Sequence, residues 1–325
     1  MIVPHYWAEA RARQRAGGKQ VTVRRFGWSD ASAEDAQAMA DARARDDLQR
    51  IVAGAPLPRR EPRVAYNGAE GTPIREEVLA RHDDVVITRN AYGARCLNTP
   101  NVLIADVDLP LRPRAGLVVL AAGALLALAA AVAWSTASWQ LLLFGMIGTI
   151  LLAGPLARLA HRLRMAALGG PEALARRRIE RFAARHPDWH LRVYRTPAGF
   201  RVLALHRLFT PSDPEVDACF GALAVDSLYA RMCRNQQCFR ARLTAKPWRI
   251  GIPGRMRPRP GVWPVADERR AARDAWIADY ERRAEGHAAC RFVARFGSST
   301  AHPAALVVQR LHDDACRAGT TLPLA

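Results

Sequence analysis

The chain has 325 residues, half of them apolar, so it is long enough for two ordinary domains or for one domain and a membrane element. It has 48 basic and 30 acidic residues, which give a formal charge of +18. A charge of this size argues against cationic partners and favours anionic ones. Nucleic acid, nucleotides and anionic lipid headgroups all satisfy this condition.

The six cysteines of the chain do not fit a usual zinc motif, and they do not indicate a disulfide framework. None forms the C-x-x-C pair of a usual zinc site, and Cys233 and Cys238 are spaced more widely than such ligands. All six stand in apolar contexts, so we expect reduced, buried cysteines of a cytoplasmic domain rather than disulfides. The six are Cys96, Cys219, Cys233, Cys238, Cys290 and Cys316.

Residues 1–60 are predicted to be a helical lead-in followed by a linker. The first residues lack a long apolar run, so we expect no signal peptide. Ser32 and Asp35 form a capping pattern, which predicts a helix that runs to about Val52 and ends at Gly54. A stretch rich in proline and arginine follows.

Residues 61–110 are predicted to be the first part of a cytoplasmic α+β domain. Pro73 lies near the start of a short predicted helix over residues 72–80. Strands are then expected at residues 85–88, 94–97 and 102–108, with a turn between the first two. Apolar residues fall on both faces of the third strand, so we expect it to be central in its sheet.

Residues 115–157 are predicted to be a transmembrane hairpin. Residues 115–134 and 139–157 carry no charge, and at 1.5 Å rise per residue each spans roughly the 30 Å of a hydrocarbon layer. The alternative is a buried helical pair in a soluble core. Small residues should let the two helices pack closely, namely Gly116, Gly123, Gly145 and Gly148.

Charges around the hairpin predict its orientation. Arginines flank the start of the first apolar segment and the end of the second, whereas Trp134 and Trp139 flank the short connection. The positive-inside rule therefore places both chain termini in the cytoplasm of a bacterium, with the protein in the inner membrane. The flanking basic residues are Arg112, Arg114, Arg158, His161, Arg162 and Arg164.

Residues 165–325 are predicted to complete the cytoplasmic domain. We expect helices at residues 171–185, 213–224, 226–234, 267–285 and 303–316, and strands at 191–195, 200–206, 239–243 and 290–296. The strands before and after the hairpin are too few to stand alone. The predicted fold is therefore α+β, with one mostly antiparallel sheet interrupted by the membrane segment.

Two aspartates end the last strand before the membrane. Asp106 and Asp108 are two residues apart on a strand, so their side chains should point to the same face. Such a pair can hold Mg²⁺ or Mn²⁺, which then binds phosphate oxygens. The alternative is a pair of solvated acids that form ion pairs with Arg112 or Arg114.

Further candidate site residues lie after the membrane segment. His206 ends a predicted strand, and Asp226 either joins a site or caps the following helix. Arg240 and Arg242 share one strand face and Lys246 follows, which suits a phosphate-bearing ligand. Equally, these charges suit a solvated edge strand that resists aggregation.

In order, these motifs resemble those of the archaeo-eukaryotic primase superfamily. "LIADVD" at residues 103–108 is similar to its first motif, "ALH" at 204–206 to its second and "VD" at 225–226 to its third, with a basic strand after it. The resemblance covers about residues 85–250 without the hairpin. It implies an RRM-like sheet, divalent metal on Asp106, Asp108 and Asp226, and phosphate contact by His206. The chain as a whole resembles uncharacterised two-pass bacterial membrane proteins.

Three functions are compatible with the sequence. The first is a membrane-tethered, metal-dependent enzyme that processes nucleotides or nucleic acid. The second is a non-enzymatic binding module for anionic lipid headgroups at the cytoplasmic face, nucleic acid or a protein partner. The third is a D-x-D glycosyltransferase, against which the first 100 residues lack the βα alternation of a nucleotide-sugar fold.

Overall fold

A computed structural model describes residues 3–61, 73–259 and 263–325, and these form two compact units. The larger comprises the described residues up to Val107 together with Ala183–Pro197 and Arg201–Ala325, and the smaller comprises Asp108–Phe182 and Ala198–Phe200. The described chain is α+β with antiparallel strand pairs, as the sequence predicts, and it contains eight α-helices.

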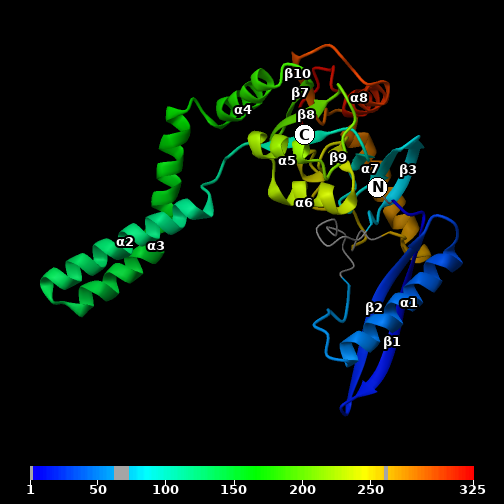
Figure 1. Cartoon of the computed structure of the whole chain (residues 1–325), viewed down its shortest axis with the longest axis horizontal. Helices are drawn as coiled ribbons and strands as arrows, with labels where there is room; N and C mark the ends of the chain where they lie inside the picture. Colours follow the sequence, from blue (N-terminus) through cyan, green and yellow to red (C-terminus); the bar gives the residue numbers. More distant parts are fainter. Residues whose placement is uncertain (1–2, 62–72, 260–262) are drawn as a thin grey trace. The chain divides into compact units, whose positions relative to one another are not determined.

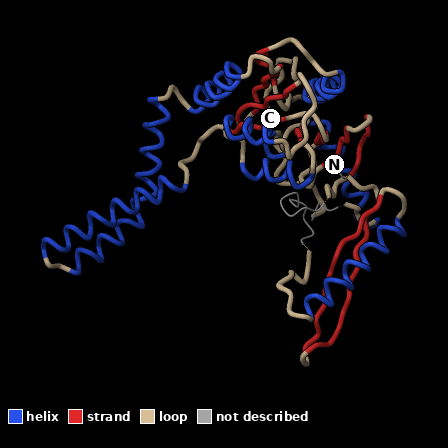
Figure 2. The backbone as a smooth tube through the Cα atoms, viewed as in Figure 1, coloured by secondary structure: helices blue, strands red, loops and turns tan. Residues whose placement is uncertain are grey.

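The larger unit begins with a β-hairpin that the sequence analysis did not predict. Strand β1 (Tyr6–Ala16) pairs antiparallel with β2 (Lys19–Ser29), and Gly17 and Gly18 at the turn both have positive φ. Helix α1 (Ala33–Val52) packs along the hairpin, as Figures 1 and 2 show. The predicted cap is confirmed, because the Ser32 side chain accepts a hydrogen bond from the Asp35 N–H.

Alanine explains why the pattern of β1 is hard to read. Ala8, Ala10 and Ala12 alternate with charged residues and pack against Ala40 and Ala44 of α1. Alanine is depleted in strands, so its alternation carries little strand signal. The small side chains bring helix and hairpin together at a spacing that larger apolar residues would not allow.

Four strands of the larger unit form one sheet, in the order β3-β4-β5-β9. They are β3 (Glu77–His82), β4 (Val85–Arg89), β5 (Arg95–Thr99) and β9 (Phe239–Arg242). The predicted helix at residues 72–80 is wrong, since Glu77 onward is strand. Asp83, with φ of 49°, reverses the chain so that β3 pairs with β4. Pairing with a neighbouring strand thus overrides the local helix signal from Pro73.

A second sheet has the order β10-β7-β8-β6. Its strands are β6 (Ile104–Asp108), β7 (His190–Thr196), β8 (Gly199–Ala204) and β10 (Arg291–Gly297). The prediction of one sheet is therefore wrong, although each of the two sheets does combine strands from before and after the apolar segment. The prediction that β6 is central is also wrong, because β6 is an edge strand.

A side chain from helix α6 covers part of the free edge of β6. Tyr229 of helix α6 (Ser227–Gln236) places its hydroxyl 2.8 Å from the Ile104 carbonyl oxygen and 3.0 Å from that of Arg240. The same hydroxyl accepts from the Arg240 N–H at 3.3 Å. The side chain thus joins β6 of one sheet to β9 of the other, and this contact replaces the neighbouring strand that the sequence suggested.

The remaining helices agree with the sequence to within a few residues. Glu281 of α7 accepts from Arg89 at 2.8 Å and from Arg95 at 2.6 Å, which fastens this helix to the sheet β3-β4-β5-β9. The helices are α4 (Pro171–Arg185), α5 (Pro214–Leu223), α7 (Arg270–Ala284) and α8 (Pro303–Cys316), with short 3₁₀ turns at Pro247–Arg249 and Asp267–Arg269.

The smaller unit contains two long apolar helices, α2 (Ala115–Thr136) and α3 (Trp139–Ala167). They lie side by side and are joined by a short turn (Figure 1). Both are long and apolar enough to cross a membrane, and no residue of α2 is buried. Helix α3 continues ten residues beyond the predicted apolar segment, which ends at Ala157.

Close packing of α2 and α3 depends on one of the four predicted glycines. A Cβ at Gly145 would lie 2.3 Å from the Cβ of Ala129, so only glycine permits this contact. Thr149, Ala153 and Ala157 continue a buried row of small residues at spacings of four. The other three glycines, Gly116, Gly123 and Gly148, have no atom within 4 Å of a Cβ, so that part of the packing prediction is wrong.

Gly27 allows α1 to pack on β2, which gives a stability prediction. In the Gly27→Ala variant the new Cβ would lie 2.1 Å from the Ala36 carbonyl oxygen and 2.3 Å from the Ala40 nitrogen. Because neither backbone atom can move without shifting the helix, we expect a loss of about 1–3 kcal/mol. Thermal unfolding of the purified protein measures the change.

Gly221→Ala is the matched control. Gly221 lies within α5, and a Cβ there meets nothing within 4 Å. Alanine should raise stability there by up to about 1 kcal/mol. Equal melting temperatures for the two variants would contradict the packing of α1 on β2.

Candidate metal centre

Helix α8 presents one buried face that carries two metal-binding side chains. Ala305, Val308, His312 and Cys316 are its buried residues, at spacings of three and four. His312 and Cys316 are therefore neighbours on the same face, one turn apart. Cys290, the residue before β10, lies against them from another element.

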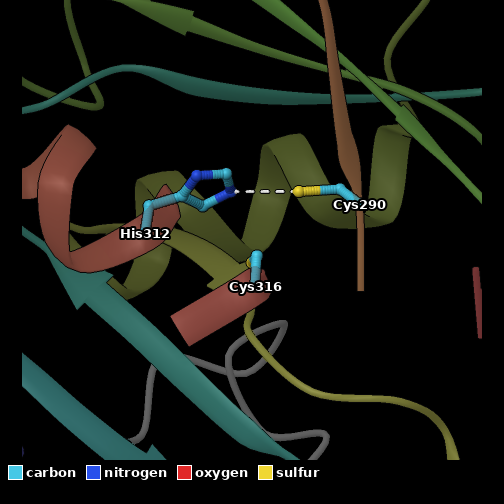
Figure 3. Close-up of side chains that lie close together, drawn as sticks. All are labelled: Cys290, His312 and Cys316. Atoms are coloured by element: carbon cyan, nitrogen blue, oxygen red, sulfur yellow. Dashed lines mark hydrogen bonds between the residues drawn. The ribbon is translucent and has the colours of Figure 1, made fainter. Parts of the chain in front are cut away.

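The three side chains converge. The Cys290 sulfur is 3.8 Å from Nε2 of His312, and the ligand atoms of Cys290, His312 and Cys316 all lie within 4.8 Å of one another. Figure 3 shows the imidazole of His312 aimed at the Cys290 sulfur. All three residues are fully buried. Among residues 3–61, 73–259 and 263–325, these residues are the one group of three histidine, cysteine or acidic side chains close enough to hold a metal ion together.

A buried arginine borders the cluster. Nη1 of Arg201, on β8, lies 3.2 Å from Nε2 of His312 and 4.0 Å from the Cys316 sulfur. The same nitrogen donates to the Arg242 carbonyl at 2.9 Å. The Asp106 carboxylate accepts from Nε at 2.8 Å and from Nη2 at 3.3 Å. Arg201 is only 3% exposed, so its charge depends on these partners.

The hydrogen bonds define the tautomer of His312. A guanidinium can only donate, so Nε2 accepts from Arg201 and the ring proton is on Nδ1. Nδ1 then donates to the Asp313 carboxylate at 2.9 Å. Asp313 is held in turn by Arg192 at 2.9 Å and Gln309 at 3.1 Å. The lone pair of Nε2 therefore points into the cluster, in the tautomer of a metal ligand.

The two cysteines differ electrostatically. The hydrogen bond from Cys316 lowers the pKa of Cys290 to about 5, and the nearby charge of Arg201 also lowers it, whereas burial opposes the shift. Burial raises the pKa of Cys316 well above its usual range. The two shifts favour negative charge on Cys290 over negative charge on Cys316. Because both sulfurs are buried, they are suited to an internal role rather than to attack on a substrate.

The acids predicted as metal ligands have other contacts. Asp106 pairs with Arg201, and Asp108 is the exposed last residue of β6. Asp226 is the exposed cap of α6, where its side chain accepts from the Leu228 N–H at 2.9 Å. In the described chain no hydrogen bond or ion pair joins Asp106 to Asp226. Their role in binding Mg²⁺ or Mn²⁺ stays a prediction.

His206 is packed among aromatic rings. Its ring centroid lies 4.7 Å from that of Trp189 and 5.4 Å from that of Phe209. Burial lowers its pKa, and the adjacent Arg207 lowers it further. The ring is therefore mostly neutral near pH 7, which weakens its attraction for a phosphate. Its contact with phosphate also stays a prediction.

The three basic residues predicted to bind phosphate lie in or after β9. Arg240 forms a buried ion pair with Glu76, and Arg242 lies 3.4 Å from the Ala325 carbonyl oxygen. The Lys246 ammonium lies 5.6 Å from the centroid of the Trp248 ring. Glu76 already neutralises the Arg240 guanidinium, so a phosphate would have to displace a buried carboxylate there.

Sequence reasoning missed the cluster although half of its signal is visible. His312 and Cys316 are four residues apart within a helix that the sequence predicts, and this spacing places two ligands on one face. Cys290 lies 22 residues before His312 and before a strand. A backbone hydrogen bond of 3.0 Å from the Ala289 N–H to the Cys316 carbonyl brings it near. The predicted burial of the six cysteines, by contrast, is confirmed.

No protein family, no curated protein and no solved structure shows a significant match to this chain.

The Arg201–Asp106 pair gives a second stability prediction. In Asp106→Asn the buried guanidinium keeps its hydrogen bonds but loses its counter-charge. Because the Asp106 side chain is 37% exposed and water partly screens it, we expect a loss of about 1–3 kcal/mol. Denaturant unfolding measures it. Glu215→Gln, in an exposed pair with Arg207, should cost less than about 1 kcal/mol.

The same variant tests the predicted metal role of Asp106. If Asp106 binds Mg²⁺ or Mn²⁺, either ion stabilises the unsubstituted protein and not Asp106→Asn. If Asp106 serves Arg201 alone, neither ion changes the melting temperature of either protein. An equal cost for Asp106→Asn and Glu215→Gln would contradict the structural role.

Proposed function

We propose that this chain is a two-pass protein of the bacterial inner membrane, and that it holds a basic α+β domain at the cytoplasmic face as a non-enzymatic binding module for anionic phospholipid. The observation that carries the proposal is the apolar surface of α2 and α3. The most apolar stretch of α2 has a mean hydropathy of 2.5 and that of α3 a mean hydropathy of 1.8. No residue of the α2 stretch is buried.

Water is a poor solvent for this surface. Val119 is 71% exposed, Phe144 67% and Ile150 81%, and large apolar side chains are exposed along the length of both helices. Burial of apolar surface is worth about 25 cal/mol per Å². Soluble monomers rarely expose contiguous apolar patches above a few hundred Å². A lipid layer supports these helices where water does not.

The lengths also suit a bilayer. At 1.5 Å per residue, the 22 residues of α2 extend over about 33 Å, and a hydrocarbon layer is about 30 Å thick. The 29 residues of α3 extend over about 44 Å, so its last turns would project beyond the hydrocarbon. Those turns carry Arg158, Arg162 and Arg164, all exposed.

The distribution of charge supports the orientation. Exposed Arg112 and Arg114 precede α2, so they lie at the same end of the helical pair as the arginines of α3. The turn at residues 135–138 carries no charge and is flanked by Trp134, 90% exposed, and Trp139, 71% exposed. Tryptophan favours the membrane interface and arginine the cytoplasmic side. We infer that both termini are cytoplasmic.

Anionic lipid is the partner that the same unit favours. Arg176, Arg177 and Arg181 of α4 are exposed, in the stretch that follows α3. A basic residue near an anionic membrane surface contributes about 1 kcal/mol of attraction. The enzymatic alternative, a nucleotide-processing site on an RRM-like sheet with Mg²⁺ or Mn²⁺, has less support, because Asp106 and Asp226 serve an ion pair and a helix cap.

Membrane extraction tests the anchor. We expect the full chain to remain in the membrane pellet after carbonate washing at high pH and to enter solution only with detergent. Leu120→Arg together with Leu128→Arg should abolish this, because an arginine costs about 2.5–3.5 kcal/mol of insertion at the helix centre and less toward its ends. Arg11→Leu together with Arg13→Leu, in β1, is the control and should leave extraction unchanged. Release of the unsubstituted chain by carbonate would contradict the proposal.

Lipid enrichment tests the partner. Nanodiscs assembled from equal amounts of phosphatidylglycerol and phosphatidylcholine should retain excess phosphatidylglycerol around the protein. Arg176→Gln, Arg177→Gln and Arg181→Gln together should lower that excess several-fold, and 1 M salt should remove it. The matched triple change at Arg11, Arg13 and Arg15 should have no effect. Enrichment that survives both salt and the α4 changes would overturn the role of this helix.

A further inference from the structure

We propose that Cys290, His312 and Cys316 together bind one zinc ion, which fastens the end of α8 to the sheet β10-β7-β8-β6. This inference concerns the larger unit only and does not depend on a membrane anchor. It rests on the convergence of three buried ligand atoms, on the tautomer of His312 and on the charge beside the cluster.

The spacing fits tetrahedral zinc. Bonds of about 2.3 Å to sulfur and about 2.1 Å to nitrogen place ligand atoms roughly 3.6–3.8 Å apart. The Cys290 sulfur and Nε2 of His312 are 3.8 Å apart, so this edge needs no adjustment. The widest separation in the group is at most 4.8 Å. That separation exceeds the tetrahedral value by about 1 Å, so zinc binding would draw the ligand atoms together.

The ligand types select the ion. Two thiolates and one imidazole are soft or borderline donors, which suit zinc and do not suit Mg²⁺ or Ca²⁺. The second shell is also in place, because Asp313 holds Nδ1 of His312 and Arg192 and Gln309 hold Asp313. A carboxylate behind a ligating histidine orients the ring and raises its basicity.

The charges balance around such an ion. Zn²⁺ with two thiolates is neutral, and Arg201 is neutralised separately by Asp106. Zinc at Nε2 would replace the hydrogen bond from Arg201, whose Nη1 keeps the Arg242 carbonyl at 2.9 Å and lies 4.0 Å from the Cys316 sulfur. A guanidinium donor next to a zinc-bound thiolate stabilises its charge. The two thiol protons are released to solvent on binding.

Burial assigns the ion a structural role. The three residues supply three of the four tetrahedral positions of a zinc ion. All three side chains are enclosed by protein, since Cys290, His312 and Cys316 are each 0% exposed. The ligands come from the start of β10 and the last turn of α8. An ion there would join two elements whose sequences are 22 residues or more apart.

Cobalt binding tests the proposal. The full chain, purified in detergent with a reductant and stripped by a chelator, should take up one Co²⁺ per chain with the absorption bands of tetrahedral cobalt–thiolate coordination. One equivalent of Zn²⁺ should bleach these bands. We expect zinc to raise the melting temperature, since it binds only the folded site. Absence of thiolate-to-cobalt bands in the unsubstituted protein would overturn the proposal.

Substitutions identify the ligands. Cys290→Ser and Cys316→Ser should each lose the cobalt bands, whereas Cys219→Ser should keep them, because Cys219 is an equally buried cysteine of α5 outside the cluster. His312→Cys should retain binding with a third thiolate, and His312→Phe should lose it. This pair keeps the test decisive even where a serine variant fails to fold. Unchanged cobalt binding in Cys290→Ser or Cys316→Ser would contradict the assignment.

Mass spectrometry addresses the competing state of the same cysteines. The proposal expects both thiols to be free in protein isolated with thiol-blocking reagent, and expects zinc to protect them from alkylation in the folded chain. A Cys290–Cys316 disulfide in protein isolated from cells under these conditions would overturn it.

Discussion

The architecture depends on the need to neutralise one buried guanidinium. Arg201 is placed on β8 inside the larger unit, and a charge there is stable only with a counter-ion and a full set of acceptors. Asp106 supplies the counter-ion from β6, and the Arg242 carbonyl of β9 and His312 of α8 supply acceptors. These partners come from three elements that are far apart in sequence. Satisfying Arg201 therefore fixes both sheets and α8 relative to one another.

The same constraint explains why apolar helices can stand in the middle of the domain's sequence. Residues 109–182 lie between β6 and β7, yet β6 belongs to the sheet of β7, β8 and β10. The Arg201–Asp106 pair and the Tyr229 hydroxyl bring the strands on either side of the insertion together.

The Asp-x-Asp motif illustrates how a residue of a chemical pattern acquires a partner that the pattern does not show. Two carboxylates on a strand suggest a cation, and Asp106 does face one, the guanidinium of Arg201. The sequence contains both residues but not their proximity, since 95 residues separate them. Similarly, the role of Tyr229 cannot be recognised in the sequence. Its hydroxyl hydrogen-bonds to the backbone carbonyls of two strands, and these strands meet only in the folded chain.

Local patterns in the sequence determined most helices, most strands of the two four-stranded sheets and the two apolar helices. Their signals are periodicity, caps and turn residues, which act within a few residues of one another. The β1–β2 hairpin escaped because alanine hides its alternation, and the helix at residues 72–80 was wrong because strand pairing decided it. Only the tertiary structure decided the division into two sheets, the edge position of β6 and the meeting of Cys290 with His312 and Cys316. These features depend on contacts between distant segments, and local preference contains no information about which distant segment will supply the partner.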